Sequence, residues 1–491
     1  MDSLHELTAV RLRDLLRTGE LAPAEVADHF LARIERANPD LGAFVAVTPR
    51  EARERAAALE RDGASRHATL WGLPSGDKDL WARAGVPTGF GSRAFAGADA
   101  VVPPASDEIV EVLDAAGTVS LGRTTAPELG FPAYTEPLAG PVARNPWDTS
   151  LGAGGSSGGA AVAVAAGLLP FAPGSDGGGS VRIPAAACGV VGLKPSRGLV
   201  PAGSGQESLG GLVVNGPLAR TTADTALLLE GMLTWGPDGR VAHPLTLRAP
   251  SARAGEYLAA ATRGEVGGSG GEDVRGRFRV GVTTDSAWDD FYEITTSPEA
   301  RAALDAGTGV LAGLGHDVEE TTLGAAPEFG PAFRTLWMAG ASAVPIDDPA
   351  VLDRLEPLTR WLIGRGREVP AREVSEALRT LTAYERRLLA QVARYDVVVT
   401  PALAMTPRPV GWFDPQDPER NFAQQCQYTP WTSMLNVAGL PAITVPTHRT
   451  DEGLPMGVQL VGSPGRERTL LAVAAQLEDR LHWADRHPPV W

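Results

Sequence analysis

Residues 174–198 read GSDGGGSVRIPAAACGVVGLKPSRG, and three consecutive glycines stand directly before a serine in this stretch. A glycine triplet loses much backbone entropy on folding and contributes no side chain to packing. We therefore expect the exposed backbone of this triplet to have a structural or functional role. One purpose is a tight turn between a strand and a helix. The other is an oxyanion hole, in which the N–H groups of Gly177, Gly178, Gly179 and Ser180 converge on the oxygen of an attacked carbonyl.

Around this stretch, short apolar segments that end in turns alternate with helical patterns. DEIVEVLDAAG is followed by TVSLG, and VVVTPA, AITVP and GVQLVG precede the helical pattern RERTLLAVAAQLEDRL. Such alternation predicts an α/β fold with a largely buried, mostly parallel or mixed sheet covered by helices. Helical periodicity in three segments between residues 3 and 62 predicts a helical N-terminal segment over residues 1–65.

The composition disfavours several classes of partner. The 491 residues carry a formal net charge of −15, whereas nucleic acids and anionic membranes favour basic proteins. The N-terminus lacks the apolar core of a secretion signal, and the longest apolar run is interrupted by Gly and Pro. Two cysteines, Cys188 and Cys426, are too few for a disulfide framework or a cysteine zinc cluster. We expect a cytoplasmic protein that acts on a small molecule without nucleic-acid or membrane partners.

Only two of the 44 basic residues are lysines, Lys78 and Lys194. A background that favours arginine this strongly should replace lysines that serve merely as positive charges. Lysine differs from arginine because a buried ammonium group can lose its proton. Lys78 is therefore a candidate base, whereas a structural role is the favoured interpretation for Lys194.

A second glycine-rich motif, GAGGSSGGAAVAVAAG, occupies residues 152–167. A phosphate cradle is disfavoured because no Lys-Ser or Lys-Thr pair follows the glycines. A nucleophile elbow with Ser156 in G-x-S-x-G would need a downstream acid and a histidine such as His448 or His482. In the third interpretation, neutral Lys78 replaces histidine and activates a serine, with no metal or organic cofactor.

The motif GGSSGG at 154–159, the stretch at 174–198 and GLPSGDKDLWARAGVPTGFGS at 72–92 together closely resemble the amidase signature family. The resemblance is clear over residues 69–204 and again from about 395 to 480, and within the family it is greatest to stand-alone bacterial amidases. It implies one domain over residues 1–491, with a large mixed, twisted sheet that has helices on both faces. Residues 69–204 would hold the core motifs, 235–394 a variable substrate-side region, and 395–491 the C-terminal part of the sheet.

The resemblance also implies the roles of individual residues. Ser180 would attack an amide, Ser156 would follow a cis peptide bond and relay protons, and neutral Lys78 would be the base. We expect Gly154 and Gly155 beside the substrate. Three further residues would hold the loop, most simply as structural hydrogen-bonding groups: Ser157, Asp176 and Arg182.

Two departures from the family pattern bear on this site. Asp77 stands beside Lys78, where the family usually has an apolar residue, and a facing carboxylate would raise the pKa of the lysine. Because neighbouring side chains of a strand point to opposite faces, we expect Asp77 to point away. Arg123 stands where the family often has lysine, in keeping with the arginine bias.

Two other functions share some of these features. A glutaminase-like amidotransferase subunit has both serine motifs but works only with partner subunits. A histidine-dependent α/β-hydrolase esterase would use Ser156 as its nucleophile. For the favoured amidase, a homodimer is possible, and aromatic and apolar side chains suggest an acyl pocket or ordinary core packing: Phe131, Tyr134, Trp337, Met338 and Trp431.

Overall fold

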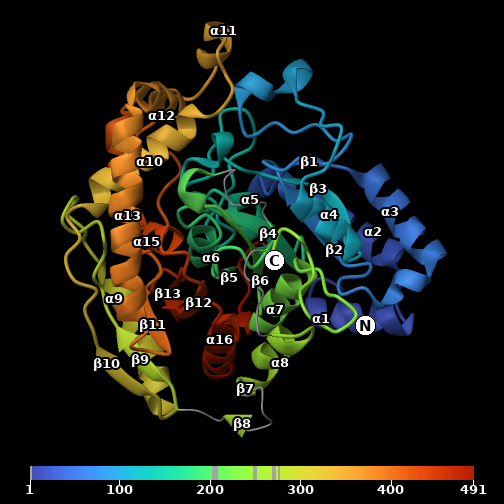
Figure 1. Ribbon diagram of the computed structural model, residues 1–491. Coiled ribbons are helices and arrows are strands. Elements are labelled where there is room, and N and C mark those ends of the chain that lie inside the picture. Colours follow the sequence, from blue (N-terminus) through green and yellow to red (C-terminus); the bar gives the residue numbers. More distant parts are fainter. Residues whose placement is uncertain (1–2, 202–207, 247–251, 268–272, 275–276) are drawn as a thin grey trace.

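The computed structural model describes residues 3–201, 208–246, 252–267, 273–274 and 277–491 (Figure 1). Its largest sheet has eight strands in the order β10-β9-β11-β13-β12-β5-β6-β4. The pairs β9–β10 and β9–β11 are parallel and the remaining neighbours are antiparallel, which confirms the predicted mixed sheet. The strands are β4 Phe171–Asp176, β5 Val191–Lys194, β6 Val214–Ala219, β9 Arg279–Val282, β10 Asp317–Glu320, β11 Val397–Pro401, β12 Ala442–Arg449 and β13 Pro455–Val461.

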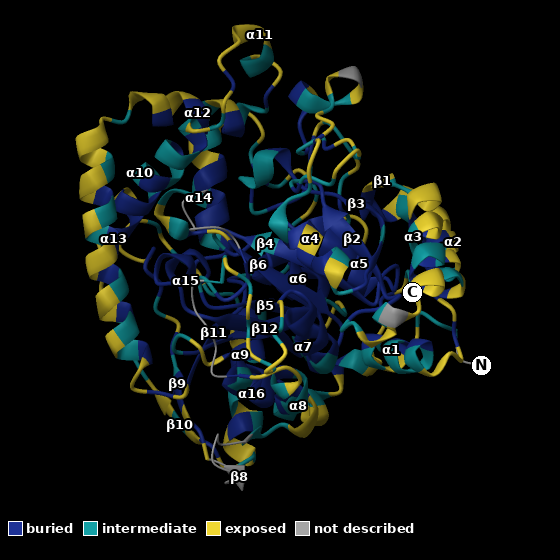
Figure 2. Ribbon diagram, turned by 45° about the vertical axis from the view of Figure 1, so that its right-hand side comes forward, coloured by how far each residue is buried: buried dark blue, intermediate teal, exposed yellow. Residues whose placement is uncertain are grey.

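Helices cover both faces of this sheet, as the alternating pattern predicted. The helices α5 (Gly158–Ala165) and α6 (Arg182–Cys188) pack against strands and against each other. On the sheet also lie α7 (Thr222–Gly231), α9 (Pro298–Gly313) and α16 (Glu467–Leu481), and α16 contacts both other helices. Strands β11 and β13 are buried at every residue, because a sheet covered on both faces favours continuous apolar runs. Figure 2 shows this buried centre in dark blue.

A second sheet has three strands in the order β1-β3-β2, formed by Phe44–Val47, Val119–Thr124 and Pro74–Lys78. Helices α2 (Pro23–Leu41) and α3 (Pro49–Asp62) pack against this sheet, α4 (Glu108–Ala115) lies beside it in Figure 1, and α1 (Ala9–Thr18) contacts α7. The three predicted N-terminal helices are present, but the prediction of a purely helical segment over residues 1–65 is wrong. The short run FVAV forms strand β1, because aromatic and β-branched residues favour strands and β3 offers an antiparallel partner.

A further group of helices, which includes α10 (Phe329–Ser342), α13 (Ala371–Val392) and α14 (Pro418–Tyr428), lies beside the large sheet (Figures 1 and 2). Buried aromatic side chains form much of the core of this part of the molecule. Helix α13 has one exposed face along its length (Figure 2). The other described elements are α8 Glu256–Arg263, α11 Pro349–Leu352, α12 Pro357–Glu368, α15 Ser433–Val437 and the pair β7 Val266–Gly267 and β8 Asp273–Val274. In the described part of the chain, no helix combines the length and apolar character needed to cross a membrane.

Candidate active site

Lys78 is the last residue of β2, and its side chain is fully buried. Strand β2 packs beside β4, so the lysine Nζ lies 2.8 Å from Ser156 Oγ and 3.0 Å from Ser175 Oγ. Nζ also donates to the carbonyl oxygen of Ser175 at 3.2 Å. Burial lowers the pKa of Lys78 to about 7, although the charge of Asp176 acts in the opposite direction. A substantial fraction of this amine is therefore neutral at neutral pH.

Ser156 lies in the loop before α5, and the Gly155–Ser156 peptide bond is cis. A Cβ at position 155 would lie 2.7 Å from the carbonyl carbon of Tyr134, so the loop accepts only glycine there. The N–H of Ser157 donates to the carbonyl oxygen of Ser180 at 3.1 Å. Its hydroxyl donates to the carbonyl oxygen of Ser175 at 3.3 Å. The two serine motifs are therefore held together by hydrogen bonds from Ser157 to backbone carbonyl oxygens of the motif that contains Ser180.

Ser180 lies in the turn between β4 and α6 and is 9% exposed. Gly179 has a φ of +133°, a conformation that L-residues rarely adopt. Its N–H donates to Asp176 Oδ1 at 2.7 Å. This N–H is therefore not available as the oxyanion-hole donor predicted from the sequence. Within the described ranges, the N–H groups of Gly177, Gly178 and Ser180 have no hydrogen-bond acceptor. The turn therefore offers three backbone donors rather than four.

A buried ion pair holds this turn in place. Arg182 contacts Asp176 through two nitrogens, each at 2.9 Å, and both side chains have no exposed surface. Asn436 donates to Asp176 Oδ1 at 2.8 Å and accepts from Arg182 at 2.7 Å. The carboxylate also accepts from the Val181 N–H at 3.2 Å. These contacts support the structural interpretation of Asp176 and Arg182.

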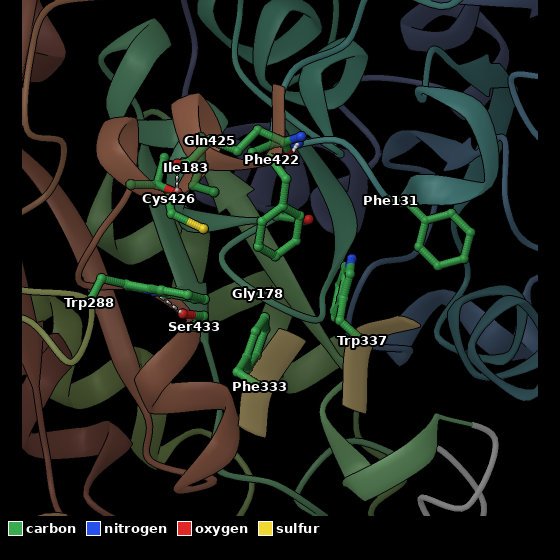
Figure 3. Close-up of a pocket in the computed structure, with 13 residues that line it drawn as sticks. Phe131, Gly178, Ile183, Trp288, Phe333, Trp337, Phe422, Gln425, Cys426 and Ser433 are labelled. Carbon is green, nitrogen blue, oxygen red and sulfur yellow. Dashed lines mark hydrogen bonds between the residues drawn. The ribbon is translucent and has the colours of Figure 1, made fainter. Parts of the chain in front are cut away.

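Two cavities meet at Ser180. The large cavity has a volume of about 650 Å³ and is lined by both Ser156 and Ser175. The aromatic pocket has a volume of about 60 Å³ and is lined by Gly178, Phe131, Ala133, Ser180, Ile183, Trp288, Phe333, Trp337, Phe422, Gln425, Cys426, Thr429 and Ser433 (Figure 3). Three residues line both cavities: Phe131, Ser180 and Trp337.

The walls of the large cavity are mostly apolar. They are formed by loops near β2 and β6 and by one face of α10, and they include Leu80, Trp81, Ile109, Leu209, Leu212 and Leu336. Two carboxylates at the start of α4, Asp107 and Glu108, also line this cavity. Asp107 accepts a hydrogen bond from the N–H of Ala82 at 2.8 Å.

Some predicted substrate-binding residues lie elsewhere. Tyr134 is buried, stacks on Phe413 and accepts a hydrogen bond from Asn421 at 2.8 Å. Met338 is buried in an apolar cluster with residues of α12. Trp431 is fully buried, and its Nε1 donates to the carbonyl oxygen of Thr284 at 3.0 Å. Of the two interpretations that the sequence left open, core packing fits these three residues, whose side chains fill the core, whereas Phe131 and Trp337 line the cavities.

Gly154 and Gly155 are also absent from the described lining of both cavities. Gly154 has a φ of +72° and packs against Ile183 and Pro184, and its carbonyl oxygen accepts from Thr135 at 2.9 Å. Their place beside the substrate stays a prediction, because neither glycine is among the described residues that line the two cavities. They allow the close packing of the loop that carries Ser156.

Several lining residues were not predicted from the sequence. Ser175 is next to Asp176 on β4, and strand alternation turns its side chain toward Lys78 while Asp176 faces Arg182. That alternation could have identified Ser175 as a neighbour of Lys78 from the sequence. Trp288, Phe333 and Phe422 come from three separate elements, and the local pattern of each is also that of a core residue. Only the spacing of Phe333 and Trp337, one helical turn apart on α10, hinted at a shared face.

The remaining sequence predictions are placed as follows. The Asp77 carboxylate faces Arg83 and Ser120 and points away from Lys78, as expected. Lys194 is fully buried, and its Nζ donates to the carbonyl oxygen of Pro195 at 3.1 Å. No histidine is among the described residues that line the two cavities, and His448 lies on β12 instead. The described residues contain no group of three or more metal-binding side chains.

A family model described as Amidase matches residues 25–471. "Putative amidase AmiB2" of Mycobacterium tuberculosis (strain ATCC 25618 / H37Rv) is 35% identical over 478 residues, which cover 97% of this chain and 96% of that protein. "Putative amidase" of Synechocystis sp. (strain ATCC 27184 / PCC 6803 / Kazusa) is 32% identical over 483 residues, 97% of this chain and 88% of that protein.

Solved structures give the same result. A 6-aminohexanoate cyclic dimer hydrolase complexed with substrate has a TM-score of 0.84 at 28% identity and covers 100% of both chains. A bacterial aryl acylamidase has a TM-score of 0.82 at 26% identity, with 98% of this chain and 97% of that chain covered. Since the family model and these relatives span nearly the whole chain, and the fold matches the two solved structures, the protein belongs to the amidase signature family and is an amidase.

Proposed function

We propose that the chain hydrolyses the carbon–nitrogen bond of a small-molecule carboxamide through an acyl-Ser180 intermediate, with Ser156 as proton relay and neutral Lys78 as base. The observation that carries this proposal is the 2.8 Å contact between Lys78 Nζ and Ser156 Oγ, on the side of the cavity that Ser180 also lines. A hydroxyl becomes a useful nucleophile when a base removes its proton, and a desolvated neutral lysine is such a base.

The reaction has two halves. In the first, Lys78 takes the hydroxyl proton of Ser156, Ser156 takes that of Ser180, and Ser180 Oγ bonds to the carbonyl carbon. The carbon–nitrogen bond then breaks, and the proton passes through Ser156 to the nitrogen, so that a neutral amine leaves. In the second half, water gives a proton to the same relay and attacks the acyl carbon. The bond to Ser180 Oγ breaks, the carboxylic acid leaves, and Ser180 regains its proton.

The negative oxygen that develops during both halves needs donors that are already in place. The N–H groups of Gly177, Gly178 and Ser180 suit this role, because the described structure provides them with no other acceptor. The N–H of Gly179 is excluded from the role by its bond to Asp176. Removing one such donor in other enzymes costs about 10²–10³ in rate.

The two alternative functions are weaker. A histidine-dependent esterase would need a histidine near the serine, and the described cavity lining contains none. An amidotransferase subunit would share the serine motifs but would need partner subunits and ATP. Activity of the isolated chain on a simple amide distinguishes the proposed amidase from an amidotransferase subunit. With p-nitroacetanilide as the substrate, released nitroaniline gives a direct colour readout.

The nucleophile is tested by the intact mass of the protein after treatment with a fluorophosphonate. We expect one adduct in the wild type, no adduct in Ser180→Ala, and nitroaniline release without partner or ATP. An adduct that persists in Ser180→Ala would place the nucleophile elsewhere, with Ser156 as the first alternative. An adduct without any amide hydrolysis would instead favour a subunit that needs partners.

A further inference from the structure

We propose that the aromatic pocket holds the acyl group and that the large cavity holds the substituent of the leaving amine, so that the enzyme prefers amides made from a short apolar acid and a bulky amine. This inference rests on the roles proposed above for Ser156 and Ser180. It assigns a direction to the bound substrate and a size to each half of it.

The direction follows from the position of Ser156. The group that protonates the leaving nitrogen must be within hydrogen-bond reach of it. Ser156 lines the large cavity together with Ser175, and neither is part of the described lining of the aromatic pocket. The nitrogen and its substituent must therefore face the large cavity. The carbonyl oxygen faces the backbone donors, and the acyl chain is left with the aromatic pocket, which also begins at Ser180.

The size follows from the rings that close the aromatic pocket. Its volume is about 60 Å³, roughly one tenth of the 650 Å³ of the large cavity. Trp288 meets Phe333 and Phe422 edge to face, with centroid separations of 5.5 and 6.3 Å, and these rings form a rigid end wall. For comparison, an apolar cavity of about 150 Å³ in another protein binds benzene. The pocket therefore suits an acyl chain of about four carbons or fewer.

The polarity of the pocket follows from contacts already made within the protein. Gln425 accepts from the N–H of Ala133 at 2.8 Å, and its amide donates to Asn421 at 2.6 Å. Ser433 Oγ accepts from Trp288 Nε1 at 3.0 Å, as the dashed line in Figure 3 shows. A charged or strongly polar acyl chain would find few partners to replace its water. The pocket therefore selects an apolar chain.

Two side chains separate the cavities. Phe131 and Trp337 line both and meet edge to face at 6.1 Å, and Trp337 also stacks on Phe333 at 5.6 Å. Figure 3 shows these rings around the aromatic pocket. A ring held on both sides by other rings moves little, so Trp337 does not swing aside to merge the aromatic pocket with the large cavity. The two halves of the substrate are recognised separately.

Two isomeric amides test the direction directly. N-(2-phenylethyl)acetamide has a short acyl group and a bulky amine, and N-methyl-3-phenylpropanamide reverses the amide bond between the same groups. We expect kcat/KM of the purified full chain to be at least about tenfold higher for the first. An equal or higher value for the second would overturn the proposal. Failure to hydrolyse either amide, together with p-nitroacetanilide, would contradict the proposed function itself.

A pocket variant tests the size. Phe422→Ala removes a ring that lines the aromatic pocket, whereas Phe278→Ala removes a similarly buried ring that packs on His316 away from both cavities. We expect Phe422→Ala to raise kcat/KM of N-methyl-3-phenylpropanamide relative to its isomer by about fivefold or more, and Phe278→Ala to leave the ratio unchanged. An unchanged ratio in folded Phe422→Ala, checked by thermal unfolding, would overturn the assignment. If that variant does not fold, Phe422→Leu makes the same test.

Discussion

Lys78 must satisfy two conflicting requirements at the scale of the single residue, since it is fully buried and yet has to exchange a proton. Burial favours its neutral form and brings its pKa to about 7. Below that pH the ammonium form cannot accept a proton from Ser156. We therefore expect kcat/KM to rise as pH increases through about 7 and to level off above it, as measured over pH 5.5–9.5 with p-nitroacetanilide. A flat profile in single-turnover acylation would contradict the role of Lys78 as base.

The second lysine provides a matched control at the same scale. Lys194 is as deeply buried as Lys78, and burial also lowers its pKa, to about 7. We expect Lys78→Met and Lys78→Arg to lower the rate of labelling by a fluorophosphonate by about 10²–10⁴, because neither side chain can act as a general base. Lys194→Met should keep the labelling rate within about threefold. Equal losses in the two methionine variants would mean that a buried amine matters only for packing.

Residue identities could be predicted where their chemistry is unusual. Two surviving lysines and two serines in glycine-rich motifs stand out in the sequence, and the structure brings Lys78 and Ser156 into contact. Their catalytic roles stay predictions. For Tyr134, Met338 and Trp431 the sequence left pocket and core both open, because an aromatic or apolar side chain has the same sequence signature in either place, and the structure places all three in the core.

The turn between β4 and α6 is the element on which Ser180 depends, and its glycines are not equivalent. A Cβ at Gly178 would meet no atom closer than 4.0 Å, whereas one at Gly179 would lie 2.6 Å from both Ile183 and Thr432. We expect Gly178→Ala to fold with an unfolding temperature within about 3 °C of the wild type but with reduced activity, because its methyl group enters the pocket. Gly179→Ala should lose several degrees or fail to fold. Similar thermal stabilities would contradict this reading of the turn.

The start of α6 carries a second prediction at the scale of the element. Burial alone would raise the pKa of Asp176, but the charge and hydrogen bonds of Arg182 hold it well below its usual range. The ionised form therefore stabilises the fold at all pH values above the pKa of an unfolded aspartate, about 4. We expect Asp176→Asn to lower the free energy of unfolding by about 3–5 kcal/mol, because it leaves Arg182 buried and unpaired. Unfolding in urea measures this.

The double variant Asp176→Asn/Arg182→Met is the control for this pair. It removes both charges together, so its loss should be smaller than the sum of the two single losses. Additive losses would show that the two side chains act independently, despite their 2.9 Å contact.

Strands formed by apolar runs between turn residues could be predicted from the sequence, whereas a very short strand could not. The predicted strands at TVSLG, VVVTPA, AITVP and GVQLVG are β3, β11, β12 and β13, since apolar runs between turn residues have few alternatives. Strand β1 was missed because four residues between two helices carry too little pattern, and its pairing with β3 is set by contacts distant in sequence.

At the scale of the whole molecule, the two ends of the described chain pack together. The ring of Trp491 lies 5.4 Å from His5 and 3.9 Å from His487, and Arg220 lies over it at 4.6 Å. Burial and the nearby charge of Arg33 lower the pKa of His5 to about 4. Between pH 6.5 and 4 an unfolded chain therefore binds a proton that the folded chain does not.

We expect the unfolding temperature to fall as pH decreases from 6.5 toward 4, with a shallower dependence in His5→Gln than in the wild type. Scanning calorimetry at several pH values measures both slopes. Parallel curves would show that this end contact does not contribute to acid sensitivity.

The arrangement of the cavities depends on the whole chain and could not be predicted locally. Trp288 follows β9, Phe333 lies on α10 and Phe422 on α14, and these segments meet only because the helices stand beside the large sheet. The family resemblance implied a variable substrate-side region over residues 235–394, and that role stays a prediction. Trp288, Phe333 and Trp337 from this range line the aromatic pocket.

The complete burial of both lysines has a practical consequence for the chemistry of the protein surface. Reagents that acylate primary amines find no accessible ε-amino group on the folded chain, because both lysines have 0% exposure and the other basic side chains are arginines or histidines. Lysine acylation followed over time would then measure how often the core opens rather than the accessibility of the surface.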